Sequence, residues 1–362
     1  MDARPSAKSL CASGRRSVFE NFLGNRHVQT TLRGMVERER IPQTMLFAGL
    51  EGLGKATLVR RFAALMLGSA EKIEQDDLSL PANSGLIAAR EKLPADKRNE
   101  DPLFFGTHPD FLTFAPEGPL RQIGIPQMRL LKERAQYKPL HGSRRIFLID
   151  RADRAGDQAA NSLLKILEEP PDHLILILTA ENVYDLLPTI RSRSVIMNFS
   201  PLSNDEMKDF ARLRELDHAE KRIALSGGSP GIAASLDIEL YQKRRASMLA
   251  LLKTGAGASS YAAWLPVSEA LARSRTEKLE LYLKLLYDLL RDITVLREGG
   301  SGIRNFDLRN ELAALSQKVS RRWIIHAVKS VDEMAKLLRR NIQKTIALDG
   351  LLMELRGPAS RI

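Results

Sequence analysis

The chain contains a single cysteine, Cys11, among its 362 residues. One thiol cannot form a disulfide within the chain, which suits a reducing cytoplasm, and it excludes a zinc site built from four thiolates. Aromatic residues make up only 6% of the chain, and they do not alternate with basic residues as in base-stacking surfaces. The sequence therefore disfavours direct recognition of single-stranded nucleic acid.

Long apolar runs are also missing. No stretch approaches the roughly 18 apolar residues that cross a bilayer, so we expect no membrane partner and a cytoplasmic protein. The N-terminus lacks the apolar stretch of a signal peptide, and we expect residues 1–16 to form a polar, mobile leader. The net charge of +11 is compatible with a nearby polyanion and equally with an ordinary basic surface. The length predicts two or three domains.

A glycine-rich segment follows the first predicted strand, residues 44–49. It runs GLEGLGK, ending at Lys55, and precedes a predicted helix over residues 58–67. In this context glycines let backbone N–H groups wrap a phosphate, while the lysine reaches the terminal phosphates. The candidate residues for phosphate binding are Gly49, Gly52, Gly54 and Lys55.

The same segment departs from the motif at its next position. A hydroxyl is expected there to bind magnesium, but residue 56 is alanine. Thr57 is one position late and would be rotated by about 100° on a helix. Two interpretations stay open: a site that still binds nucleotide, with Thr57 beside it, or a loop kept for packing. Hydrolysis at this loop is disfavoured.

A second nucleotide motif is expected at the end of a predicted strand over residues 146–149. Asp150 is the candidate metal-holding carboxylate, but Arg151 stands where the motif places a second acid that orients water. A predicted helix (158–167), strand (174–178) and short helix (184–190) follow. Arg191 and Arg193 come next, and an arginine there could reach a nucleotide on a neighbouring chain; the alternative is an ordinary surface arginine.

Two longer strings, NSLLKILEEPP (161–171) and LPTIRSRS (187–194), closely resemble the clamp-loader ATPases of the AAA+ class. The resemblance implies an α/β fold with a doubly wound parallel sheet over residues 17–199. It further implies a small helical lid over 200–238 and an all-helical, oligomerising collar over 239–362. The apolar positions within 279–297 fall on one helical face, as a collar core requires.

The resemblance also indicates the type of subunit. Ala56, Arg151 and Gly231 fit a subunit that hydrolyses ATP poorly better than they fit the ATP-hydrolysing gamma/tau subunits. Such a subunit would assemble with gamma/tau and delta subunits and help to load the sliding clamp onto primed DNA. Arg193 would act in trans on the ATP of a neighbouring subunit.

Several points stay open or differ from the family. Many members carry a four-cysteine zinc module, but residues 71–105 hold no cysteine, so we expect no zinc and one helix (84–93) there. No other metal is predicted, and no cofactor is certain, since the degenerate loop could hold ATP, ADP or neither. A self-sufficient gamma/tau-like ATPase and a scaffold without nucleotide are the alternatives; a sequence-specific DNA-binding protein has little support.

Overall fold

The computed structural model describes residues 19, 21–273, 279–337 and 343–357. By their contacts these residues form two compact units. The first unit contains the residues up to 219 together with 228–234, and the second contains 220–227 together with the residues from 235 onward. The predicted lid, residues 200–238, is thus shared between the units, and the predicted domain boundaries stay predictions.

A parallel sheet forms the centre of the first unit. Its strand order is β2-β3-β4-β1-β5, and every neighbouring pair is parallel. Every residue of β1 to β4 is buried, whereas the edge strand β5 is largely exposed. Near-continuous apolar runs suit strands that are covered on both faces. The strands are β1 (Thr44–Ala48), β2 (Phe111–Phe114), β3 (Arg145–Ile149), β4 (Leu174–Ala180) and β5 (Val195–Asn198).

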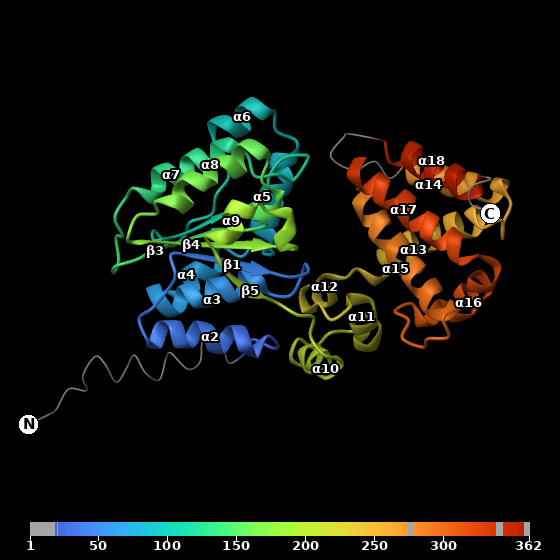
Figure 1. Cartoon of the computed structure of the whole chain (residues 1–362), viewed down its shortest axis with the longest axis horizontal. Coiled ribbons are helices and arrows are strands. Elements are labelled where there is room, and N and C mark those ends of the chain that lie inside the picture. The colour runs from blue at the N-terminus through green and yellow to red at the C-terminus, as the bar shows by residue number, and fades with distance from the viewer. Residues whose placement is uncertain (1–18, 20, 274–278, 338–342, 358–362) are drawn as a thin grey trace, which may run out of the picture. The chain divides into compact units, whose positions relative to one another are not determined.

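Helices cover both faces of this sheet. Figure 1 shows α2, α3 and α4 below the sheet and α7, α8 and α9 above it. Successive strand residues face opposite layers: Phe147 packs in the core with α7 and α8, and its neighbours Ile146 and Leu148 pack with α2 and α3. The helices are α2 (Arg26–Glu37), α3 (Lys55–Leu67), α4 (Ala70–Glu74), α7 (Ile125–Ala135), α8 (Asp157–Glu168) and α9 (Pro188–Ser192).

The region between α3 and β2 contains more structure than predicted. Residues 71–105 form the end of α4 together with α5 (Pro81–Glu91) and α6 (Ala95–Glu100), not one helix. Buried Arg60 of α3 pairs with Glu74 and Asp77, which fixes the start of this region. The weak apolar pattern of these helices misled the prediction, because ion pairs to distant residues hold them in place.

Three short helices follow β5. Ser203 begins α10 with a capping box, in which its hydroxyl accepts from Glu206 N and the Glu206 carboxylate accepts in return. This cap satisfies helix N–H groups that have no intrahelical partner. The helices are α10 (Asn204–Leu213), α11 (Ala219–Ser226) and α12 (Pro230–Ser235).

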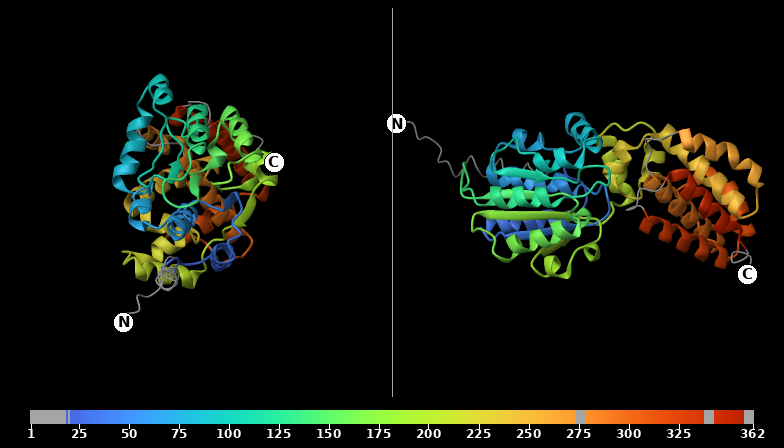
Figure 2. Two further views of the ribbon diagram at one scale, coloured as in Figure 1. Left: turned by 90° about the vertical axis from the view of Figure 1, so that its left-hand side faces the viewer. Right: turned by 90° about the horizontal axis from the view of Figure 1, so that it is seen from above.

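The second unit is built from helices around one apolar core, and Figure 2 shows them side by side in orange and red. The face predicted for residues 279–297 is confirmed, since the apolar residues of α15 that compose it are buried. Among the described residues, no helix is long and apolar enough to span a membrane. The helices are α13 (Ile238–Gly255), α14 (Leu265–Arg273), α15 (Leu279–Arg297), α16 (Arg309–Lys318), α17 (Arg321–Leu337) and α18 (Lys344–Arg356).

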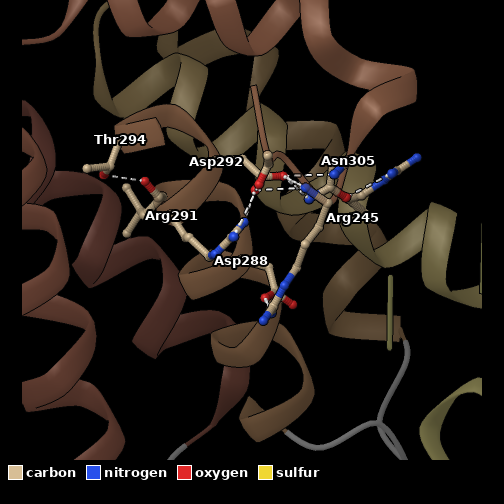
Figure 3. Close-up of polar contacts among 9 residues, drawn as sticks. Arg245, Asp288, Arg291, Asp292, Thr294 and Asn305 are labelled. Atoms are coloured by element: carbon tan, nitrogen blue, oxygen red, sulfur yellow. Dashed lines mark hydrogen bonds and ion pairs between the residues drawn. The ribbon is translucent and has the colours of Figure 1, made fainter. Parts of the chain in front are cut away.

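A buried polar network lies inside this second unit (Figure 3). Fully buried Asp292 accepts hydrogen bonds from the backbone N–H of Arg304 and from both the backbone and side-chain amides of Asn305. Arg245 of α13 donates to Asn305 Oδ1 and to Asp307. The network therefore ties α13, α15 and the segment that precedes α16 to one another.

Short 3-10 helices lie in several of the connections between these elements. They are η1 (Ala152–Arg154), η2 (Val183–Asp185), η3 (Tyr261–Ala263) and η4 (Phe306–Leu308). The predicted fold class, an α/β domain built on a parallel sheet with an all-helical C-terminal part, is confirmed. At the carboxyl end of the sheet, β3, β4 and β1 lie side by side, so the loops that follow them meet at one edge.

Candidate functional site

The glycine-rich loop joins β1 to α3, as predicted. Gly54 has φ 83°, a left-handed conformation that favours glycine, and it directly precedes the first residue of α3. Its carbonyl accepts from Leu58 N at 2.9 Å and so begins the helical hydrogen bonding. The loop therefore presents the N-terminus of a 13-residue helix, where free N–H groups favour an anion.

Lys55 lies within this loop and is buried to 9% exposure. Its ammonium donates hydrogen bonds to the carbonyls of Gly49 and, at 2.7 Å, of Leu50. Burial lowers the pKa of Lys55, while the carboxylates of Asp150 and Glu181 oppose that shift. The lysine is thus satisfied by its own loop, and it must leave these carbonyls to reach a phosphate.

The next two residues of α3 offer no hydroxyl beside Lys55. The methyl group of Ala56 packs against the core beneath the sheet. The hydroxyl of Thr57 accepts a long hydrogen bond of 3.5 Å from the guanidinium of Arg60, one helical turn further on. The described contact of Thr57 is therefore with Arg60 of its own helix.

The carboxylate at the end of β3 is held by the neighbouring strand. Fully buried Thr179, at the end of β4, donates from its hydroxyl to Asp150 Oδ1 at 2.6 Å. The same hydroxyl accepts from the backbone N–H of Arg151 at 2.8 Å. Thr179 therefore joins the ends of β3 and β4.

Arg151 extends from this strand end to the glycine-rich loop. Its backbone is left-handed, with φ 55° and ψ 56°, and its guanidinium forms an ion pair with Glu51. Burial disfavours the charged form of Arg151, but Glu51, Asp150 and Glu181 outweigh it and raise the pKa of the guanidinium. A cation thus lies among three carboxylates where the motif has a second acid.

The start of α12 packs on the same loop. Gly231 N donates to Gly52 O at 2.8 Å. A Cβ atom at Gly231 would lie 3.0 Å from both Cα and O of Gly52, and one at Gly52 would lie 2.9 Å from Ile232 N. A side chain at position 231 would therefore require the glycine-rich loop to shift.

These residues do not fit a magnesium ion in the way the motif demands. Residue 56 has no hydroxyl, Asp150 accepts from Thr179, and Arg151 supplies a positive charge beside the remaining carboxylates. The loop keeps the backbone shape of a phosphate cradle, with Gly49, Gly52 and Gly54 all at positive φ. Nucleotide binding at these residues stays a prediction.

Arg193 lies at the end of α9, whose bounds correct the predicted helix over 184–190. Pro188 is the first residue of α9, and Arg191 lies inside it. The Arg193 side chain is 38% exposed and pairs with Glu168 at 3.2 Å, and it also donates to Thr189 O at 3.4 Å. Within the described residues, no hydrogen bond or ion pair joins Arg193 to the glycine-rich loop.

Three contacting side chains escaped the sequence prediction. Tyr184 is 77% exposed, and the guanidinium of Arg191 lies over its ring at 5.0 Å. Glu168 and Glu51 hold Arg193 and Arg151. Glu51 is an acid inside the phosphate loop, and Arg151 is a base where the motif has an acid. Because their charges are opposite, these two unusual residues could have suggested the pair.

The chain is similar to known proteins over most of its length. Residues 100–203 match the family model described as DNA polymerase III, delta subunit. DNA polymerase III subunit delta' of Pseudomonas aeruginosa is 28% identical over 86% of this chain and 92% of its own length. The Bacillus subtilis delta' subunit is 25% identical over 91% of this chain and 95% of its own length.

A third relative has a different role in its name. The gamma/tau subunit of Mycobacterium tuberculosis strain H37Rv is 30% identical, but over 50% of this chain and 28% of its own length. The delta' relatives match nearly end to end, and the gamma/tau relative matches in part. The chain is therefore similar to delta' subunits over most of its length, which supports a delta' subunit of the DNA polymerase III clamp loader.

Proposed function

We propose that this chain acts on a nucleotide bound to a neighbouring subunit and hydrolyses ATP poorly, if at all, at its own loop. The observation that carries the proposal is the contrast between its two candidate sites. The glycine-rich loop is engaged by Lys55, Arg151 and the start of α12. Arg193, in contrast, ends an exposed helix and is held by one solvent-exposed carboxylate and one carbonyl.

Poor hydrolysis at the loop follows from three side chains. Ala56 removes the hydroxyl that binds the metal, Arg151 removes the acid that orients water, and Gly231 cannot contact a phosphate through a side chain. Loss of a catalytic acid or base alone costs about 10²–10⁴ in rate. Gly49, Gly52, Gly54, Lys55, Thr57 and Asp150 would then form a degenerate nucleotide site.

The role of Arg193 at a neighbouring subunit follows from the chemistry of its guanidinium and from its exposure. A guanidinium is always charged and offers several donors that match phosphate oxygens. An exposed ion pair such as that with Glu168 is worth only about 0–1 kcal/mol, so phosphate could displace the carboxylate at little cost. An arginine supplied in trans is worth about 10³–10⁵ in rate.

The partners follow from this role and from the family. We infer an assembly with gamma/tau subunits, whose ATP Arg193 would contact, and with a delta subunit. The sliding clamp and primed DNA would be bound through this assembly, in the cytoplasm. The helices of the second unit would contribute to its oligomeric collar.

The test is steady-state ATP turnover by the assembly reconstituted from purified subunits. We expect Arg193→Ala to lower turnover at the affected site by about 10³ or more, and Arg193→Lys to fail as well because lysine lacks the planar fork. Arg212→Ala is the matched control, because Arg212 is also an exposed arginine paired with an acid, Asp209. Equal turnover for R193A and R212A would contradict the proposal.

The rival functions give different results with the purified chain. A self-sufficient ATPase would turn over ATP with magnesium at a rate comparable to the whole assembly. A scaffold without nucleotide would show no saturable ATP binding by calorimetry at any accessible concentration. The proposal predicts negligible turnover by the chain alone, whatever its affinity for nucleotide.

A further inference from the structure

The pair of Arg151 and Glu51 connects the glycine-rich loop to the residue that follows β3. Arg151 follows β3, and Glu51 lies 100 residues earlier, between Gly49 and Gly52. Both side chains are 36% exposed, so solvent reaches the pair. The ion pair holds the glycine-rich loop against the end of β3.

The backbone of Arg151 shows that this position is built into the fold. Its N–H donates to Thr179 Oγ1, and that hydroxyl in turn donates to Asp150. The left-handed conformation of Arg151 is unusual for a residue other than glycine, and the hydrogen bond that its N–H donates to Thr179 Oγ1 stabilises it. The guanidinium is therefore carried by a fixed strand end and directed to the loop.

The charges around Arg151 are balanced within the chain. Glu51, Asp150 and Glu181 place negative charge around Arg151. In a hydrolysing site, magnesium neutralises such carboxylates together with the phosphates. A guanidinium stays charged at all physiological pH values, so here the neutralising cation is part of the chain.

We propose that Arg151 is a built-in cation that stands in for the metal and, through Glu51, latches the glycine-rich loop shut. The loop then binds nucleotide only in the fraction of molecules whose latch is open, and magnesium does not strengthen that binding. If one molecule in about ten is open, the apparent affinity is about tenfold weaker than that of the open loop. This inference concerns the chain's own loop and does not depend on Arg193.

The latch is tested by binding and by stability. Calorimetry with ADP, with and without magnesium, compares the wild-type chain with Arg151→Ala and Glu51→Gln. In the presence of magnesium, which replaces the cation lost in R151A, we expect both variants to bind ADP about tenfold more tightly than wild type. We also expect Mg²⁺ alone to raise the melting temperature of R151A by about 2 °C, because its carboxylates lack a cation, and to leave wild type unchanged.

Arg121→Ala is the matched control, because Arg121 also has a positive φ and pairs with a glutamate, Glu91, in the same unit. Its ADP affinity and its response to Mg²⁺ should equal those of wild type. Weaker ADP binding by R151A would show that Arg151 is a phosphate ligand, which would overturn the latch. Wild-type binding that magnesium strengthens would overturn it as well, and E51Q carries the test if R151A does not fold.

Discussion

Replacing Asp292 by alanine should destabilise the second unit strongly. Asp292 is fully buried and accepts from Arg304 N, Asn305 N and Asn305 Nδ2. The variant leaves these donors without an acceptor, and each unsatisfied buried group costs about 1–3 kcal/mol. The half-exposed Arg291, which also donates to Asp292, adds little. We therefore expect a loss of about 3–5 kcal/mol in the free energy of unfolding.

Tryptophan fluorescence during urea unfolding measures this loss selectively. The chain has two tryptophans, Trp264 and Trp323, and both are buried in the core of the second unit. With a denaturant slope of about 2 kcal/mol/M, the midpoint should fall by about 2 M. Asp332→Ala is the control, since exposed Asp332 accepts, from the part of the chain that the structure describes, only from the Tyr287 hydroxyl and should cost about 1 kcal/mol or less. A midpoint for D292A equal to that of D332A would refute the reasoning.

Two further predictions concern Arg193 and pH. Glu168→Ala should raise assembly turnover by about twofold to fivefold, because Arg193 no longer has to leave an exposed ion pair worth up to about 1 kcal/mol. Glu169→Ala should change nothing, and an E168A effect that persists in an R193A background would contradict this prediction. Burial lowers the pKa of His108, so the unfolded chain binds a proton more readily than the folded chain does. The free energy of unfolding therefore falls as the pH drops below about 6.5. His108→Asn should remove that part of the acid sensitivity in urea unfolding at pH 7.5, 6.5 and 5.5, and identical pH profiles would refute the assignment.

Much of the sheet could be predicted because its strands are buried on both faces. The runs that became β1, β3 and β4 are apolar and short, which distinguishes them from helices. The edge strand β5 was missed, because it has four residues and exposes three of them. The helix predicted over 184–190 was misplaced, although Pro188 carried the signal of a helix start.

The sequence predicted which residues belong to the candidate site, but it did not predict the contacts between them. Spacing identified Lys55 and Asp150 and flagged Arg151 as an anomaly. The partner of Arg151 lies 100 residues away in the chain, and the packing of Gly231 on Gly52 spans a still longer separation. Such pairs depend on which loops the sheet order brings together, and local patterns do not contain that order.

The central claim is that the chemistry of this chain acts on a neighbour's nucleotide. It is tested most directly by single-turnover hydrolysis of ATP already bound to gamma/tau subunits, after addition of the wild-type or R193A chain with delta. The account predicts a rate constant at the adjacent site that rises by about 10³ with the wild-type chain and stays at its basal value with R193A. An equal acceleration by both chains would contradict it.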